Sequence, residues 1–296
     1  MHKKQRLLLG AHLSIAGGWE KAFTAAAALG CSCIQFFIQN SRQWKTSALT
    51  KESIEQFEKA QTTTSIYSVV AHASYLINLG SSNELVSQRS VEALSFELYR
   101  CQQVNIPYVV LHPGSAGTEQ SIEKCLNRIS NNLDYVLKTI PGTTMILLEQ
   151  SAGQGTSVGY SFEQLATIRE QVEAKNRLGF CFDTCHAFAA GYQFSNASQY
   201  YDMWQHFDHI IGIEHLKVIH INDSKKGMGS RIDRHENIGK GMIGLEAFKL
   251  LFNDPLFFDI PKILETPKKH PDDDTHNMQT IKNLLSLETR ELLGEI

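Results

Sequence analysis

The amino-acid sequence predicts an α/β fold: a closed (β/α)8 barrel forming a single domain over residues 1–296, with a site at the carboxyl ends of its strands. Two observations carry this prediction. Short apolar runs alternate eight times with longer amphipathic runs, without a low-complexity linker, and six consecutive apolar runs end in His, Asp or Glu. The chain is 42% hydrophobic and 20% charged, which is enough for one large core, and barrels of about 250 residues form one domain.

The eight apolar runs have the length of β-strands, and their near-continuous hydrophobicity is typical of parallel strands covered on both faces. They span residues 7–12, 33–38, 68–72, 108–112, 145–149, 178–183, 216–220 and 262–265. The amphipathic runs predict helices over residues 19–29, 51–61, 84–104, 120–137, 162–172, 199–211, 245–252 and 278–287. Glycine and proline residues punctuate the returns. A doubly wound open sheet has a similar pattern and is the alternative fold.

The polar residues at the ends of the apolar runs favour the barrel. From the third run onward these residues are His72, His112, Glu149, Asp183, His220 and Glu265. Any one of them alone is more often structural, as a helix cap or a backbone hydrogen-bonding partner. In a barrel, however, all strand ends converge on one mouth, whereas an open sheet would spread them along a line. Six such ends in succession therefore indicate a shared site at a barrel mouth.

The segment that follows the seventh run adds further polar residues. His220 ends the run, and the long polar loop after it carries Asp233 and His235, which project to one side if that loop is extended. A solvated loop is the alternative interpretation. With His186, the candidate metal ligands number nine: His72, His112, Glu149, Asp183, His186, His220, Asp233, His235 and Glu265.

These nine residue types indicate a metal site with several ions. Four carboxylates crowded together repel one another and require compensating positive charge. Nitrogen and oxygen ligands without thiolates favour zinc, with manganese or iron as alternatives. Nine ligands exceed the capacity of one ion and, with a bridging carboxylate, fit three. Such a site suits hydrolysis of phosphate esters, so we expect a phosphoesterase.

Charge and cysteine content narrow the class further. The net charge of −3 argues against a generic basic nucleic-acid binder, although the six positive charges of three divalent ions would change it to +3. The six cysteines form no CxxC pair, and we expect packed, reduced thiols, including Cys181 and Cys185 beside Asp183. The first apolar run is too short for a signal peptide, and no later run could span a membrane. We therefore expect a cytoplasmic protein without membrane contact.

Two predicted loops carry exposed side chains suited to DNA. Arg42 follows the second apolar run, and Tyr75 and Leu76 follow the third. An arginine, a tyrosine and a leucine near one mouth would be able to insert into a duplex and stack on bases. Ordinary loop packing is the alternative interpretation for each.

Several longer motifs resemble one family. They are GAHLS at residues 10–14, SYLINL at 74–79, LHPG at 111–114, FDTCH at 182–186, GSRIDRH at 229–235 and LETP at 264–267. Together they resemble endonuclease IV, a family of zinc-dependent apurinic/apyrimidinic endonucleases with a TIM-barrel fold, and the resemblance spans residues 8–285. Gln39 and Gln193 depart from it, because we expect a lysine at residue 39 and an acidic residue at 193.

The resemblance implies a ligand set and a reaction. His72, His112 and Glu149 would hold one Zn²⁺; Glu149, Asp183, His220 and Glu265 a second; and His186, Asp233 and His235 a third, with Mn²⁺ as a partial substitute. Glu149 would be the catalytic residue, bridging two ions beside the nucleophile. The family cleaves 5′ to an abasic site, leaving a 3′-hydroxyl and a 5′-deoxyribose phosphate, and trims blocked 3′ ends.

The resemblance also implies the partner. It is double-stranded DNA that contains abasic sites or blocked 3′ ends, bound by a monomer. Arg42, Tyr75 and Leu76 match residues that enter the minor groove and hold the nucleotide flipped out. Two other functions stay open. A sugar isomerase or epimerase on the same barrel would need only one or two metals, and a non-catalytic DNA-binding module would use metals only to hold its loops.

Overall fold

The computed structural model describes residues 6–44, 47–118 and 121–294. Eight parallel strands close into a barrel in the order β1-β10-β7-β6-β5-β4-β3-β2. The strands are β1 (Leu9–His12), β2 (Cys33–Phe37), β3 (Ser68–His72), β4 (Tyr108–Leu111), β5 (Met145–Glu149), β6 (Leu178–Asp183), β7 (Leu216–Ile221) and β10 (Lys262–Leu264). The predicted (β/α)8 TIM barrel is confirmed, and the open sheet is excluded because β1 pairs with both β2 and β10.

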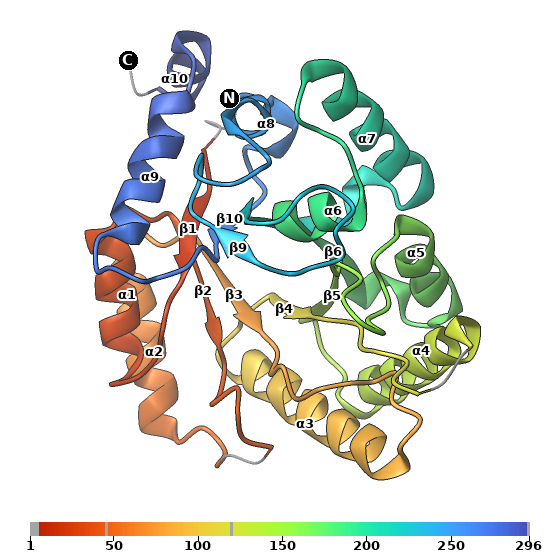
Figure 1. The fold of residues 1–296 in the computed structure, drawn as a ribbon. Coiled ribbons are helices and arrows are strands. Elements are labelled where there is room, and N and C mark those ends of the chain that lie inside the picture. The colour runs from red at the N-terminus through yellow and green to blue at the C-terminus, as the bar shows by residue number, and fades with distance from the viewer. Residues whose placement is uncertain (1–5, 45–46, 119–120, 295–296) are drawn as a thin grey trace.

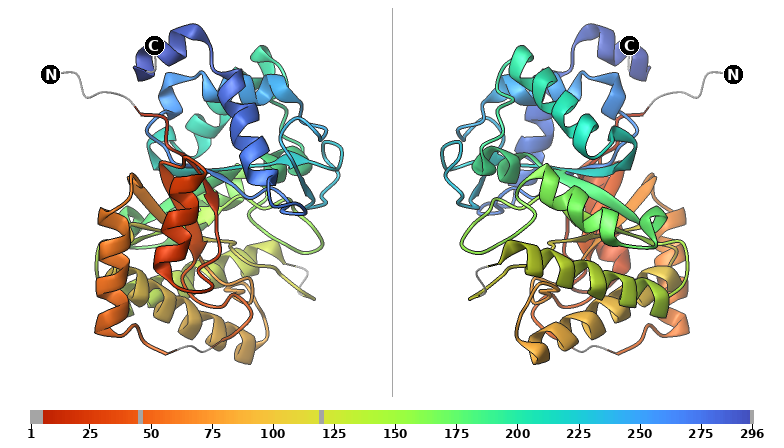
Figure 2. Two further views of the ribbon diagram at one scale, coloured as in Figure 1. Left: turned by 90° about the vertical axis from the view of Figure 1, so that its left-hand side faces the viewer. Right: turned by 90° about the vertical axis from the view of Figure 1, so that its right-hand side faces the viewer.

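Helices surround this barrel on the outside (Figures 1 and 2). They are α1 (Trp19–Ala28), α2 (Lys51–Thr62), α3 (Glu84–Gln103), α4 (Ile122–Thr139), α5 (Phe162–Gln171), α6 (Thr184–Ala190), α7 (Ala197–Ile210), α8 (Leu245–Phe252), α9 (Asp273–Leu284) and α10 (Leu287–Leu293). Thr50, Asn83, Ser121 and Ser161 cap α2 to α5 by accepting backbone N–H groups. In the described parts of the chain, no helix is long and apolar enough to cross a membrane.

The larger apolar core lies between the barrel and its helices, and includes Phe36, Phe57 and Phe180. A second apolar cluster fills the inside of the barrel. Every strand from β2 to β7, together with β10, contributes one buried residue to it: Cys33, Val70, Val110, Leu147, Cys181, Val218 and Ile263. Since side chains alternate along a strand, this cluster defines the inward-facing positions of each strand.

Three segments differ from the sequence prediction. The predicted closing helix over residues 278–287 is wrong, because α9 runs from Asp273 to Leu284 and α10 begins separately at Leu287. The helix is interrupted at Ser286, because the Ser286 hydroxyl caps α10 by accepting the Thr289 N–H. The short helix α6 and the hairpin β8 (Asp223–Ser224) with β9 (His235–Glu236) were not predicted. The predicted start of the fourth helix, residue 120, lies outside the described residues.

Candidate metal centre

The candidate ligands at the strand ends continue the inward-facing side of the barrel. Moving two residues along each strand from the inner apolar cluster leads to Gln35, His72, His112, Glu149, Asp183, His220 and Glu265. The same period of two that buries a valine or leucine on each strand therefore brings a polar side chain inward at the mouth. His112 and Glu265 lie one residue beyond β4 and β10, and not in those strands as predicted.

Glu149 lies at the centre of this group and is completely buried. Its Oε2 atom is 3.3 Å from Nε2 of His72 and 3.2 Å from Nε2 of His112. Its Oε1 atom is 2.9 Å from Nδ1 of His220 and 3.4 Å from Nδ1 of His186. The two oxygens of one carboxylate thus face different sets of imidazoles, which is the arrangement expected of a bridging ligand.

Two further groups adjoin Glu149. The first has ligand atoms within 4.8 Å of one another on Glu149, Asp183, His220 and Glu265. The second surrounds Asp233, whose Oδ2 is 3.3 Å from Nε2 of His186 and whose Oδ1 is 3.3 Å from Nε2 of His235. Asp183 also lies within 4.8 Å of the ligand atoms of His186 and His235. All nine candidate ligands therefore form one connected cluster.

Short elements after β6 and β7 position the Asp233 group. Asp183 ends β6, and its Oδ1 accepts the backbone N–H of His186 at 2.8 Å, which caps α6 and places His186 one turn into that helix. The β8–β9 hairpin pairs Ser224 with His235. It returns the long loop to the mouth, so that Asp233 and His235 meet His186.

Four histidines are oriented by hydrogen bonds from one ring nitrogen, which faces away from Glu149 in three of them and lies 3.4 Å from Oε1 of Glu149 in His186. Nδ1 of His72 donates to the Ala73 carbonyl oxygen, and Nδ1 of His186 donates to that of Gln150. Nδ1 of His235 donates to the Glu265 carbonyl oxygen. Nε2 of His220 donates to the amide oxygen of Gln35 at 2.9 Å. Because these oxygens can only accept, the other nitrogen of each ring presents its lone pair to the centre, as in metal sites.

Gln35 is a functional candidate that the sequence analysis missed. Besides accepting from His220, its Nε2 donates to Oε1 of Glu265 at 2.6 Å and to Nδ1 of His12 at 3.0 Å. His12 is in turn 3.2 Å from Oε1 of Glu265. Gln35 thereby holds two candidate ligands, His220 in β7 and Glu265 directly after β10. The available signal was a glutamine in the middle of the apolar run 33–38.

The electrostatics of the cluster show why it needs positive charge. Burial opposes ionisation of Glu149, but His112 and His220 hold the pKa of this carboxyl well below its ordinary value. Burial likewise opposes ionisation of Asp233, yet His186 lowers the pKa of Asp233 to about 2. Burial disfavours the charged form of His186, whereas Asp183 and Asp233 raise the pKa of this imidazole. Divalent cations would supply the same positive charge in place of imidazole protons, so the donor set fits a metal centre.

Two cysteines lie close enough to this centre to be considered as ligands. Cys181 Sγ lies within 4.8 Å of ligand atoms of Glu149 and His220, and Cys185 Sγ within 4.8 Å of those of Asp233 and His235. Both thiols are buried and free, and burial raises the pKa of each to about 12. Because only a thiolate is a strong ligand, both positions agree with the expectation of packed thiols.

The predicted DNA-contact residues lie on two loops beside the centre. The Tyr75 ring is 5.4 Å from the ring of His72 and 5.8 Å from that of His112, centroid to centroid, and 63% of Tyr75 is exposed. Arg42 is exposed on the β2 loop, where its backbone N–H donates to Asn40. Leu76 is half-buried. Tyr75 therefore borders the metal centre, while Arg42 lies on the neighbouring loop.

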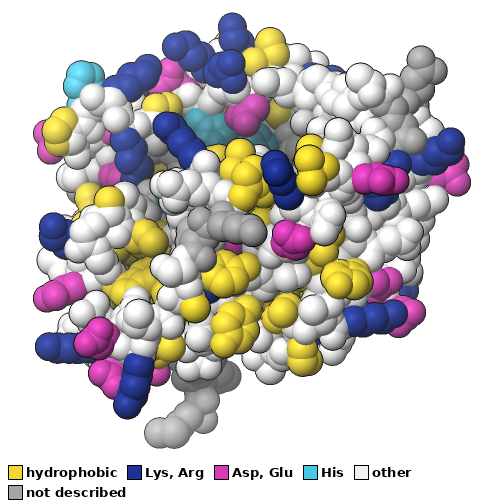
Figure 3. Space-filling view, turned by 90° about the horizontal axis from the view of Figure 1, so that it is seen from below, with side chains coloured by type: hydrophobic (Ala, Val, Ile, Leu, Met, Phe, Trp, Pro, Cys, Tyr) yellow, Lys and Arg dark blue, Asp and Glu magenta, His cyan; other side chains and the backbone are white. Residues whose placement is uncertain are grey.

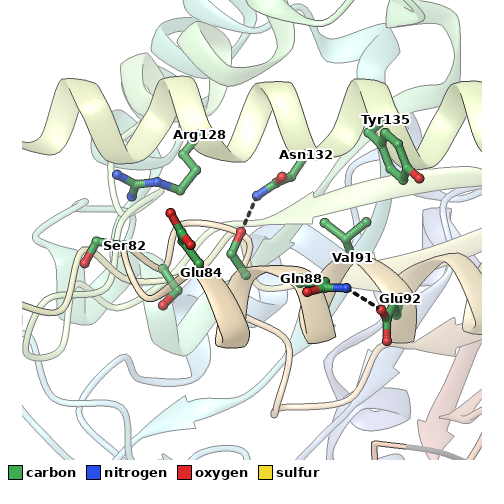
Figure 4. A pocket seen from close by; sticks show the side chains of 10 residues that line it. Ser82, Glu84, Gln88, Val91, Glu92, Arg128, Asn132 and Tyr135 are labelled. Atoms are coloured by element: carbon green, nitrogen blue, oxygen red, sulfur yellow. Dashed lines mark hydrogen bonds between the residues drawn. The ribbon is translucent and has the colours of Figure 1, made fainter.

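A hollow of about 800 Å³ adjoins the centre on the side of β1 and β2, and its lining includes His12, Phe37 and Lys268. In Figure 3, histidine side chains are visible inside a hollow, with hydrophobic side chains on the surface beside it. A separate pocket of about 460 Å³ lies between α3 and α4 and is lined by residues such as Gln88, Arg128 and Tyr135 (Figure 4). None of the nine candidate ligands lines that pocket.

Comparisons with known proteins agree with this geometry. A family model described as "Xylose isomerase-like TIM barrel" matches residues 23–286. A protein of Chloroflexus aggregans named "Probable endonuclease 4" is 43% identical over 94% of this chain and 98% of its own length. One of Geotalea daltonii with the same name is 43% identical, with 94% and 98% covered. This chain belongs to the endonuclease IV family.

A solved structure supports this membership. Endonuclease IV from Thermus thermophilus superposes with a TM-score of 0.82 at 34% identity, covering 93% of this chain and 98% of that one. A D-tagatose 3-epimerase-like protein superposes with a TM-score of 0.70 at 18% identity, covering 97% and 98%. The second match shows a shared fold only. The endonuclease IV family relation, in contrast, combines nearly full coverage with 34% to 43% sequence identity.

Proposed function

We propose that this protein is a DNA repair endonuclease that hydrolyses the phosphodiester 5′ to an abasic site through a trinuclear zinc centre, leaving a 3′-hydroxyl and a 5′-deoxyribose phosphate. We extend the proposal to trimming of blocked 3′ ends, since both reactions hydrolyse a phosphate ester. The observation that carries it is the connected cluster of nine His, Asp and Glu side chains at the mouth of a barrel of the endonuclease IV family.

The three observed groups suggest which residues would hold each ion. His72, His112 and Glu149 form one group, and Glu149, Asp183, His220 and Glu265 form another. The contacts of Asp233 with His186 and His235 form the third. Zinc ions in these positions would activate water and neutralise the phosphoryl oxygens and the leaving 3′-oxygen. Their ligand types, nitrogen and carboxylate oxygen, suit zinc and partly manganese.

The side chains have distinct roles in this proposal. Glu149 presents one oxygen to each of two ligand groups, so with metals bound it would also be placed to orient the attacking water between them. Gln35 fixes the ring of His220 and the carboxylate of Glu265 by hydrogen bonds, which keeps both pointed at the centre. The burial of Glu149, Asp183 and His220 excludes bulk water, which strengthens these electrostatic interactions.

DNA would reach the centre across the loops after β2, β3 and β7. The Tyr75 ring lies beside the rings of His72 and His112, and its exposed face offers a surface for stacking. Arg42 and Leu76 would enter the minor groove beside it, which holds the abasic nucleotide out of the stack. Lys225, Lys226, Arg231 and Arg234 make the β7 loop basic, as phosphate contact requires.

The direct test combines a nicking assay with metal analysis. We expect the purified protein to contain about three zinc ions per chain and to nick a duplex with one defined abasic site on its 5′ side. An intact duplex of the same sequence is the control. One or two metals per chain without nicking would favour an isomerase or epimerase. Tight binding without a nick, with the metals fully loaded, would favour a DNA-binding module.

The Tyr75→Ala variant tests the DNA-contact loop. We expect weaker discrimination between abasic and intact duplexes, by about tenfold, because base stacking on an aromatic ring contributes about 1–3 kcal/mol. The zinc content is expected to stay unchanged, since Tyr75 is not one of the nine candidate ligands. Binding of both duplexes is measured by fluorescence anisotropy. Tyr67→Ala, at another exposed tyrosine, is the control. If Tyr75→Ala discriminates as well as the wild type, the residue that inserts into the duplex lies elsewhere.

A further inference from the structure

Glu97 is a completely buried carboxylate on α3 that does not belong to the metal centre. Its Oε1 accepts a hydrogen bond from Nε2 of Gln39 at 2.7 Å. The backbone N–H of Ser74 lies 3.3 Å from Oε1 and 3.2 Å from Oε2. Gln39 belongs to the loop after β2 and Ser74 to the loop after β3. One buried carboxylate thus joins the two loops that carry Arg42 and Tyr75.

The hydroxyl of Ser74 extends this connection directly to the DNA-contact residues. Its Oγ donates to the carbonyl oxygen of Ser41 at 2.7 Å, and accepts the backbone N–H of Leu76 at 3.2 Å. Ser41 precedes Arg42, and Ser74 precedes Tyr75. The backbones on which all three DNA-contact residues depend are therefore held by one small network centred on Glu97 and Ser74.

The environment of Glu97 makes this network sensitive to the charge of the carboxylate. Burial raises the pKa of Glu97 to about 7, against the hydrogen bonds from Ser74 and Gln39 and the positive charge of Arg100. Gln39 supplies a hydrogen bond but no charge. Burying a carboxylate is costly unless it is hydrogen-bonded, so the donors of both loops stabilise Glu97 while Glu97 holds those loops.

We propose that Glu97 is a positioning residue for the reading of abasic DNA, acting through the loops after β2 and β3. This inference rests on the proposed function. By holding Arg42, Tyr75 and Leu76 in place before DNA arrives, Glu97 lowers the conformational entropy that would otherwise be lost on binding. Its effect falls on recognition of the abasic nucleotide, because its hydrogen bonds are to Gln39 and Ser74 and not to any of the nine candidate ligands.

Glu97→Gln is the sharpest test because it keeps the size of the side chain. An amide offers only one acceptor oxygen, so it is unable to accept from Ser74 and from Gln39 with separate oxygens, and the Gln39 amide has to turn over to accept from the new NH₂ group. The matched control is Glu92→Gln on the same helix, where the exposed carboxylate accepts a hydrogen bond from Gln88 (Figure 4). Ser74→Ala is a second, milder variant that removes the hydroxyl but leaves the N–H contact to Glu97.

Hydrogen exchange of the free protein tests the network independently of any activity. We expect the amides of residues 39–44 and 73–77 to exchange at least about tenfold faster in Glu97→Gln than in Glu92→Gln, with the barrel strands unchanged. Ser74→Ala is expected to produce the same pattern to a smaller degree. Unchanged exchange in both loops would overturn the proposal.

Binding and kinetics then test the consequence for DNA. We expect Glu97→Gln to raise the Kd for an abasic duplex about tenfold, with the Kd for intact duplex, the zinc content and kcat at saturating DNA each within about threefold of the wild type. Equal loss of affinity for both duplexes, or a fall in kcat with loss of zinc, would overturn it. A wild-type protein that fails to nick abasic DNA would instead refute the proposed function, while the exchange result stands separately.

Discussion

The Glu149→Gln variant is expected to lower kcat on an abasic duplex at least about a hundredfold. Glu149 is the only described residue whose two carboxylate oxygens contact four histidines, two on each oxygen. In glutamine, an NH₂ group replaces one oxygen, so the side chain is unable to bridge two cations or orient water between them. The Kd for DNA is expected to change little, because Glu149 is completely buried, whereas Arg42 and Tyr75, the proposed DNA-contact residues, are exposed.

Single-turnover kinetics and equilibrium binding on the same duplex would separate these effects. Glu92→Gln, an identical change at an exposed position of α3, controls for the chemistry of the substitution. Zinc analysis of both variants shows whether the loss of rate follows loss of an ion. If Glu149→Gln cleaves at the wild-type rate, Glu149 does not have the proposed role, whatever its effect on DNA affinity.

Removing the metals is expected to abolish nicking and to lower the thermal stability of the protein. Four carboxylates, of Glu149, Asp183, Asp233 and Glu265, lie in one cluster, and without cations they repel one another unless the histidines carry protons. An ion that binds only the folded chain contributes about 4 kcal/mol when its free concentration is a thousand times its Kd. The midpoint of unfolding is therefore expected to fall by about 10 °C or more.

Thermal unfolding and nicking would be measured on protein treated with a chelator, and again after zinc is restored. Recovery of both quantities on addition of zinc distinguishes metal loss from irreversible damage by the chelator. An unchanged midpoint after complete removal of the metals would show that the nine side chains do not form an energetically important metal site in the folded protein.

Hydrophobic periodicity was sufficient to predict alternating strands and helices because it is a local signal, but it did not distinguish a closed barrel from an open sheet. Each strand, such as Met145–Glu149, buries both faces and therefore appears as a short apolar run. The polar residues at the strand ends were also visible, and the structure brings all nine into one cluster. Their roles as ligands of three zinc ions stay a prediction. The break between α9 and α10 was missed because one serine hydroxyl at Ser286 decides it.

The contacts around the ligands were decided only by the tertiary structure. Gln35 reaches His220 across 185 residues of sequence, and Glu97 reaches Gln39 across 58. The sequence around each residue shows only that a polar residue lies among apolar ones, and does not predict its contact. The sequence by itself determined how apolar and polar residues alternate along each strand, and therefore which His, Asp and Glu residues face inward at the mouth. Closure of the barrel then brought residues that are far apart in the sequence into contact, and these contacts orient the inward-facing side chains. Local periodicity does not encode such contacts.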